Sequence, residues 1–221
     1  MHKSFKWISA LVLILVVFLF AQEPSVEGEV QTKFGVGFKF GVGSILGDKL
    51  SRTEQAPGPV TSLEGHFNLQ ETVEVITEVA YGYNDVDFTL GSATVSRIYQ
   101  RSFTVGFRFY LNALQVSGIV PTLSFGSGFY EWFYTNSDEE LNFSGDGIQK
   151  YKGRELSFHS VGLNAGLGLR YKISGNFALD FIARFHFIQS KDNTDRFGPN
   201  DDHDRNMDAG VGLVWLIPLR R

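Results

Sequence analysis

The sequence contains no cysteine and no clustered run of basic residues. Without cysteine the chain forms neither disulfide bonds nor thiolate metal sites. A formal net charge of -4 and scattered lysines and arginines argue against nucleic acid as a partner. The glycines form no phosphate-binding motif, because they recur at every second position along extended segments instead. We therefore expect no nucleic acid, no cofactor and no metal ion.

Long apolar runs are also missing, except for one near the start of the chain. There, residues 7–21 form a run of about 15 apolar or small residues after two lysines, whereas a membrane-spanning helix needs roughly 20. A basic start, a short apolar core and a small residue before a polar stretch are typical of a secretory signal peptide. We expect residues 1–21 to be a signal peptide and residues 22–221 to form one domain. The alternative is an uncleaved membrane anchor.

The sequence does contain a regular alternation, clearest in residues 33–43. Large apolar residues occupy one parity, at Phe34, Val36, Phe38, Phe40 and Val42. Lysine and glycine occupy the other. Successive side chains of a β-strand point to opposite faces, so this segment has one apolar face and one small, polar face. A sheet that is apolar outside and polar inside is typical of a β-barrel in a lipid bilayer.

The alternation recurs in seven further segments, at residues 61–69, 73–83, 99–111, 119–133, 160–171, 177–187 and 208–219. Each is long enough to cross a bilayer at a tilt, which takes about 9–11 residues. Short connections alternate with long polar ones, and the long ones are residues 44–59, 84–98, 135–159 and 189–207. Outer-membrane barrels have short periplasmic turns and longer external loops. The sequence predicts an all-β, eight-stranded antiparallel up-and-down transmembrane β-barrel, preceded by the signal peptide.

This pattern also predicts the location of the chain. Such barrels lie in the outer membrane of a Gram-negative-type bacterium, and an even number of strands puts both termini in the periplasm. The expected partners are the outer-membrane lipid and an extracellular partner bound through the four long loops.

Charged residues with inward parity form the candidate site. They are Lys39, Glu64, His66, Glu74, Glu78, Arg108, Arg170, Asp180 and Arg184. An eight-stranded barrel is just wide enough for side chains to fill it, and buried charges persist only when paired. Counting around the short turns sets His66 opposite Glu74, and Arg170 diagonal to Asp180. We expect a rigid plug of balanced charges; the alternative is a gate or narrow path for ions or small solutes.

Residues near the strand ends suggest contacts with the membrane interface. Aromatic residues suit an interfacial girdle, expected at the outer rim from Tyr81, Tyr83, Tyr99, Tyr130, Trp132 and Phe133. Arg97 and Arg101 have outward parity at the same end. They contact either anionic lipid headgroups or solvent.

Several segments resemble one family of membrane proteins. Residues 103–111, 121–129 and 161–171 are similar to strands of the small outer-membrane β-barrels that include the OmpA transmembrane domain, OmpX and the opacity-type adhesins. The resemblance runs from about residue 30 to the end, and implies a type of barrel without implying an activity. No periplasmic domain follows the last strand, so the peptidoglycan attachment of full-length OmpA is not implied. The last residue is Arg221, where the family usually has an aromatic residue.

Two polar groups are candidates for chemical sites. Ser157 and His159 share a strand face and Ser160 lies on the other, which supplies a hydroxyl and a base for acyl transfer. No orienting acid can be assigned from the sequence. Residues 192–208 are rich in aspartate but lack the spacing of a calcium loop, so we expect a solvated acidic loop. We expect no catalytic residue.

These observations favour a stand-alone outer-membrane barrel with a structural or surface-interaction role carried by its long loops. The alternatives are a narrow channel and a lipid-modifying enzyme.

Overall fold

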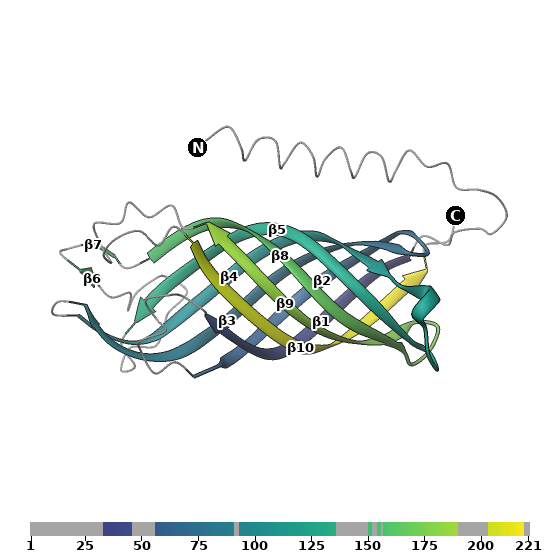
Figure 1. Ribbon diagram of the computed structural model, residues 1–221, viewed down its shortest axis with the longest axis horizontal. Helices are drawn as coiled ribbons and strands as arrows, with labels where there is room; N and C mark the ends of the chain where they lie inside the picture. The colour runs from purple at the N-terminus through teal and green to yellow at the C-terminus, as the bar shows by residue number, and fades with distance from the viewer. Residues whose placement is uncertain are drawn as a thin grey trace, which may run out of the picture. The chain divides into compact units, whose positions relative to one another are not determined.

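The structure, a computed structural model, describes residues 33–45, 56–90, 93–135, 150–151, 154–155, 157–189 and 203–218 (Figure 1). The expected signal peptide and the alternative membrane anchor lie outside these residues. The barrel strands are β1 (Lys33–Ile45), β2 (Gly58–Gln70), β3 (Val73–Leu90), β4 (Ala93–Tyr110), β5 (Ile119–Thr135), β8 (Ser157–Lys172), β9 (Phe177–Gln189) and β10 (His203–Pro218). A two-stranded sheet pairs β6 (Lys150–Tyr151) with β7 (Arg154–Glu155), and η2 (Asn112–Leu114) is one short 3₁₀ turn.

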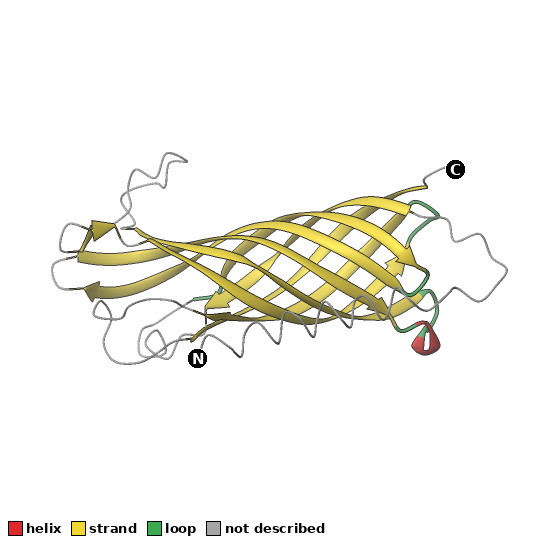
Figure 2. Cartoon of the chain, turned by 90° about the horizontal axis from the view of Figure 1, so that it is seen from above, coloured by secondary structure: helices red, strands yellow, loops and turns green. Residues whose placement is uncertain are grey.

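The barrel strands form one closed antiparallel sheet. Each strand pairs with its neighbours along the barrel in chain order, and β1 closes the circle by pairing with β10 from Lys33↔Pro218 to Ile45↔Asn206. The strands are strongly tilted, as Figure 2 shows. This confirms the predicted all-β, eight-stranded antiparallel barrel. Closure leaves no strand edge unpaired, which a bilayer requires because it offers no water to unpaired backbone groups.

Within the part of the chain that the structure describes, no helix is long and apolar enough to cross a membrane.

The predicted faces follow from the two-residue period. Phe38 and Phe40 are 54% and 57% exposed, whereas Lys39 between them is only 2% exposed. Soluble proteins bury their apolar side chains, but the other strands of this barrel also carry large apolar residues on the outside. This exposed apolar surface, called here the belt, suits the hydrocarbon core of a membrane.

One end of the barrel, here called the turn end, carries the short connections. These are residues 71–72, 111–118 and 173–176. In the second of them, Gly118 has a φ of +80°, a left-handed conformation that favours glycine, and an antiparallel bridge joins Val116 to Ile119.

The opposite end, here called the distal end, has longer strands than predicted. Residues 84–98 were expected to form a loop, but β3 runs to Leu90 and β4 begins at Ala93 (Figure 1). The prediction was wrong because the alternation does not stop there; its polarity reverses. Asp85 and Asp87 are exposed, while Val86 and Ile98 are buried.

The other three predicted loops are shortened by the same extension. The strands take in residues 44–45, 58–59, 135, 157–159, 189 and 203–207, and two-residue strands lie at 150–151 and 154–155. Residues 46–55, 136–149, 152–153, 156 and 190–202 lie outside the described residues. The last strand likewise begins at His203, before the predicted residue 208.

Candidate functional site

The inward side chains of seven strands meet in the lumen. All nine predicted charged residues lie there, with exposed fractions between 0% and 7%. They come from β1, β2, β3, β4, β8 and β9, and Asp208 adds β10, so the site exists only when the sheet is closed. Charged side chains this deep require partners, because an unpaired buried charge is strongly destabilising.

Nearer the turn end, two arginines join two carboxylates in a set called here the lower cluster. Arg108 Nη1 lies 2.5 Å from Asp180 Oδ2 and 3.2 Å from Glu74 Oε2. Arg170 Nε lies 2.6 Å from Asp180 Oδ1, and its Nη1 lies 3.1 Å from Glu74 Oε1. Arg170 also donates to the hydroxyl of Tyr110. Each carboxylate is thus shared by two guanidinium groups from different strands.

Nearer the distal end lies the upper cluster, built around one lysine and one arginine. Lys39 Nζ lies 2.9 Å from Glu78 Oε1, 3.4 Å from Asp208 Oδ1 and 3.9 Å from Glu64 Oε1. Arg184 donates to both oxygens of Glu78, with Nη2 at 2.7 Å from Oε1. One carboxylate therefore holds two cations that reach it from β1 and β9.

A hydrogen-bonded chain extends the upper cluster. His186 Nε2 lies 2.6 Å from Asp208 Oδ2, and its Nδ1 lies 2.8 Å from the hydroxyl of Tyr130. Asn164 donates to the same hydroxyl at 3.5 Å. The two ring nitrogens of His186 thus link the Tyr130 hydroxyl on β5 to the Asp208 carboxylate on β10.

His66 links the two clusters. Its Nε2 lies 3.2 Å from Glu64 Oε2 and its Nδ1 lies 3.2 Å from Glu74 Oε2. Both ring nitrogens carry a proton only in the imidazolium form, so a carboxylate on each side suits the charged ring. That charge also completes the balance. The lumen holds five carboxylates, at Glu64, Glu74, Glu78, Asp180 and Asp208, against the cations Lys39, Arg108, Arg170 and Arg184.

The register differs from the two predicted pairings. His66 lies opposite Ile76, and Glu74 lies opposite Asn68, so the contact of His66 with Glu74 is diagonal. Arg170 lies directly opposite Asp180. Both predictions miscounted the turns by one pair of residues: the β2–β3 pairing shifts between Asn68 and Gln70, and the bond from Ile173 N–H to Phe177 C=O closes the other turn.

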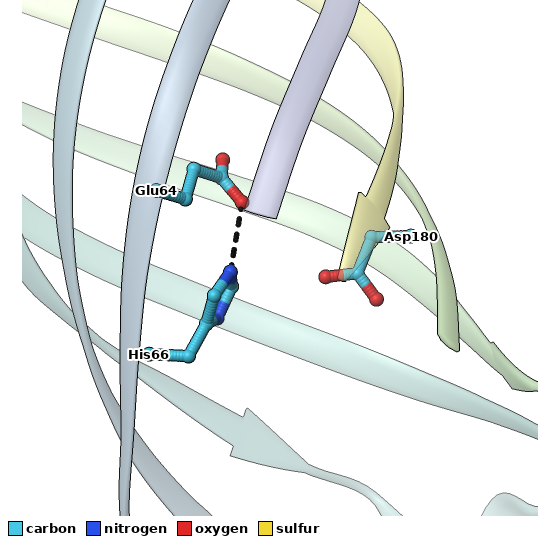
Figure 3. A group of neighbouring side chains, drawn as sticks. All are labelled: Glu64, His66 and Asp180. Carbon is cyan, nitrogen blue, oxygen red and sulfur yellow. Dashed lines mark ion pairs between the residues drawn. The ribbon is translucent and has the colours of Figure 1, made fainter. Parts of the chain in front are cut away.

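Glu64, His66 and Asp180 offer donor atoms within 4.8 Å of one another, which is close enough to suggest a metal site (Figure 3). Figure 3 also shows the ion pair of Glu64 with His66, with Asp180 facing them from β9. Both oxygens of Asp180 already accept from arginines, however. A divalent cation there would lie beside two guanidinium groups. The arrangement belongs to the ion-pair network and does not fit a metal.

Apolar side chains are buried on both sides of the charges. At the distal end Val86, Val95, Ile98, Tyr130, Trp132 and Ile188 pack as one buried cluster, called here the distal core. Towards the turn end, Val120, Ala178, Val214 and Leu216 are buried. A cavity of about 20 Å³ beside Glu78, Arg184 and Asp208 has room for about one water molecule.

The distal core also corrects the predicted aromatic girdle. Tyr130 and Trp132 are only 1% and 5% exposed, because their parity on β5 is inward. Tyr81, by contrast, has outward parity and is 38% exposed. Phe177 and Trp215 stack on the outer face near the turn end, with ring centroids 6.4 Å apart.

Sequence reasoning missed five members of the lumen network: Tyr110, Tyr130, Asn164, His186 and Asp208. Each has inward parity on its strand, so the signal was present. Asp208 was instead counted in the acidic loop of residues 192–208, of which residues 192–202 lie outside the described part of the chain.

His159 lies elsewhere, on the outer face of β8 near the distal end, and its side chain is 74% exposed, while Ser160 has the opposite parity on the same strand. His159 Nδ1 lies 3.0 Å from Glu131 Oε1 of β5, which is the acid that the sequence could not assign. The outward position that follows His159 on its strand is Val161, and Ser157 pairs in register with Phe133. The polar pair therefore borders an apolar surface.

Comparisons with known proteins agree with this architecture. Residues 11–215 match the family described as the outer membrane protein beta-barrel domain. No curated protein matches the chain significantly in sequence. Neisserial surface protein A is similar in structure, with a TM-score of 0.54 and 14% identity over 82% of this chain and 96% of that one.

Two further solved structures are similar. OprG from Pseudomonas aeruginosa has a TM-score of 0.52 and 16% identity, covering 88% of this chain and 100% of that one. Ail, the attachment invasion locus protein of Yersinia pestis, solved with the heparin analogue sucrose octasulfate, has a TM-score of 0.51 and 13% identity, covering 85% and 99%. At these identities the likeness shows the fold alone.

Proposed function

The chain belongs to the outer membrane protein beta-barrel family, and we propose that it is a barrel whose lumen is permanently closed and whose distal end carries a structural or surface-interaction role. The observation that carries the proposal is the lumen itself. Buried ion pairs from seven strands fill it between two apolar layers. Such a barrel anchors its connecting segments in the membrane and passes no solute.

The proposed orientation puts the turn end and both termini in the periplasm and the distal end outside the cell. The exposed carboxylates Asp85 and Asp87 on the long β3–β4 hairpin support this, because they extend a water-facing surface beyond the belt. The segments available to a partner are residues 44–59, 84–98, 135–159 and 189–207. In the second of these, a strand hairpin takes the place of a loop.

Ion conductance tests the closed lumen. Purified chain reconstituted into a planar bilayer should show no steady conductance. Removal of the Arg184 side chain by Arg184→Ala should give openings, because it leaves space beside the existing cavity and takes one cation from Glu78. Arg205→Ala, on the exposed outer face of β10, is the matched control and should stay silent. Steady conductance of the unaltered chain would contradict the proposal.

Epitope tags test the orientation. A tag inserted within residues 46–55, between β1 and β2, should be labelled by antibody on intact cells. A tag in the short turn at residues 173–176 should be labelled only after the outer membrane is permeabilised. The reverse labelling would show that the barrel is inserted the other way round.

A narrow channel is the second candidate. The cavity beside Glu78 and Arg184 supports it, because a water-sized space next to buried ion pairs is where a path would open. A channel of this kind should show conductance in the unaltered chain that is lost when Glu78 and Arg184 are both neutralised. The role we propose is not catalytic.

A further inference from the structure

His66 is fully buried between the two ion-pair clusters of the lumen (Figure 3). It lies on β2, with its Nε2 at 3.2 Å from Glu64 Oε2 and its Nδ1 at 3.2 Å from Glu74 Oε2, so each ring nitrogen has a carboxylate beside it. Gly37 of β1 leaves room for the ring, because a Cβ at that position would lie 2.9 Å from His66 Nε2. The ring is therefore held in one place with an acceptor at each nitrogen.

The two protonation states of an imidazole do not fit this place equally well. A neutral ring has one N–H group and one nitrogen lone pair, whereas the imidazolium form has two N–H groups. In the neutral form, one nitrogen of His66 would turn its lone pair towards a carboxylate oxygen at 3.2 Å. The site is buried, so solvent does not weaken that repulsion. The contacts favour the charged ring.

Glu64 has few other sources of positive charge. Among the ion pairs of the described residues, Glu64 meets only His66 and Lys39. Its contact with Lys39 is long, at 3.9 Å between Oε1 and Nζ, and Lys39 Nζ lies closer to Glu78, at 2.9 Å. The nearest cation that Glu64 can have is therefore the protonated ring of His66.

Charged side chains from the surrounding strands complete the environment of the ring. Arg108 Nη1 lies 3.2 Å from Glu74 Oε2, the oxygen that His66 Nδ1 also approaches. Strand by strand, the charged groups around the ring or its two carboxylates are Lys39 of β1, Glu64 of β2, Glu74 of β3, Arg108 of β4, Arg170 of β8 and Asp180 of β9. The described lumen holds five carboxylates against four lysine and arginine cations, and the proton of His66 supplies the fifth positive charge.

We propose that His66 keeps both ring protons in the folded barrel and that its charge links the upper and lower clusters. Above about pH 7 the histidines of an unfolded chain are largely neutral, so folding takes up one proton. A proton held more strongly by the folded state adds stability that is fully present at low pH and is lost as the pH rises. The barrel should therefore be less stable in alkaline than in neutral solution. The proposal concerns the charge network and holds whether or not the lumen conducts.

Urea unfolding of the full chain at a series of pH values tests the proposal. Zwitterionic detergent micelles are suitable, because their headgroup charge does not change over the range used. The equilibrium constant of unfolding should rise about tenfold for each pH unit above about 7, the slope for one proton, until the folded barrel also loses it. A flat profile would overturn the proposal, since folding would then take up no proton.

Two substitutions of His66 assign the proton. His66→Gln removes the titrating group, so its profile should be flat and its stability at about pH 7 should fall towards that of the unaltered chain at high pH. His66→Lys supplies a cation that does not titrate in this range, so it should also be flat but should exceed the unaltered chain in stability at about pH 9. A slope that survives in His66→Gln would belong to another group and would overturn the proposal.

The matched control is His186→Gln. His186 is also buried in the lumen, but its Nε2 lies 2.6 Å from the Asp208 carboxylate while its Nδ1 lies 2.8 Å from the hydroxyl of Tyr130. A hydroxyl can donate or accept, so this place does not require a charged ring. The slope should persist in His186→Gln. Its loss there, to the same extent as in His66→Gln, would overturn the assignment to His66.

Nitrogen NMR of the histidine rings tests the charge directly. In the folded chain labelled with ¹⁵N-histidine, at about pH 7.5, one ring should show hydrogen on both nitrogens, as only the imidazolium form does. If His66→Gln fails to fold, Glu64→Gln keeps the ring and removes one of its two carboxylates, so the imidazolium signal and the slope should both decrease. A neutral His66 in the unaltered folded chain would overturn the proposal, as would an unchanged signal and slope in Glu64→Gln.

Discussion

The apolar residues of the strands face outward in one part of the barrel and inward in another. In the belt, Phe38 and Val79 are 54% and 58% exposed and Lys39 is buried. Beyond the belt, on the extension of β3 and β4, Asp85 and Asp87 are exposed and Val86 and Ile98 are buried. The backbone pairing continues through the change, with one irregularity between Asp85 and Phe88.

The difference shows that the surroundings of the sheet, and not its topology, decide which parity is apolar. Facing hydrocarbon, the outer positions must be apolar and the charges turn inward. Facing water, apolar side chains are stabilised by burial, and the distal core forms in the lumen. The same kind of substitution should therefore have different effects in the two parts. An outward charge should be harmful in the belt and tolerated beyond it.

The largest effect should come from the lower cluster. Glu74→Gln leaves Arg108, Arg170 and His66 facing a neutral amide, and breaking such a buried pair costs about 3–5 kcal/mol of the free energy of unfolding. Urea unfolding of the barrel in detergent micelles or vesicles measures it. Glu71→Gln, at an exposed turn position, is the control and should lie within about 0.5 kcal/mol of the unaltered chain. Similar losses in both variants would mean that the network contributes little.

An arginine placed in the belt should be the next most damaging change. Phe181 lies on the outer face of β9 and is 44% exposed, so Phe181→Arg puts a charge into hydrocarbon at a cost of about 2–4 kcal/mol. The folded fraction is measured by gel migration before and after heating, since closed barrels resist detergent until boiled. Asp87→Arg places the same charge on the outer face of the distal part, and this variant should assemble normally. Failure of both variants would remove the contrast between the two parts.

A smaller effect should distinguish the two kinds of apolar surface. Ile188 is 1% exposed in the distal core, so Ile188→Ala leaves a cavity and should cost about 2 kcal/mol. Leu213 is 49% exposed on the belt, where lipid chains can fill the space left by Leu213→Ala. Urea midpoints compare the two variants. A greater loss from Leu213→Ala would place the main apolar contribution of these positions on the outer face.

The smallest effect should come from the surface ion pair of the distal hairpin. Arg97 Nε lies 2.7 Å from Asp85 Oδ1, and the Asp85 side chain is 60% exposed. Such exposed pairs contribute about 0–1 kcal/mol and are screened by salt. Asp85→Asn should therefore lower stability slightly at low ionic strength and leave it unchanged at high ionic strength. A loss that persists in high salt would indicate a contact other than the ion pair.

The architecture could be predicted because it depends on a local pattern. Parity along each strand needs no knowledge of its partner, and it correctly separated Phe38 and Phe40 from Lys39. The ends of β3 and β4 could not be predicted in the same way. A polar residue such as Asp85 was interpreted as loop because outward positions were assumed to remain apolar, and in water that assumption does not hold.

Register across long connections was also beyond the sequence. The position of Arg170 could be estimated to within one residue pair, because only a short turn separates it from Asp180. Glu131 and His159 pair across the long connection between β5 and β8, so no local count relates them. Tyr130 was placed by its type and its nearness to a strand end, although its parity already pointed into the lumen.

The contacts of the lumen also constrain how this chain can assemble. Glu78 meets Arg184 at a separation of 106 residues, and Lys39 meets Asp208 at a separation of 169. The first three strands already bring Lys39 to Glu64 and Glu78, but the second cation of Glu78 and the contact of Lys39 with Asp208 come from β9 and β10. A partly inserted barrel would lack these late contacts and would leave Glu78 with one cation instead of two. Closure of β1 on β10 therefore completes a charge network that the early strands only begin.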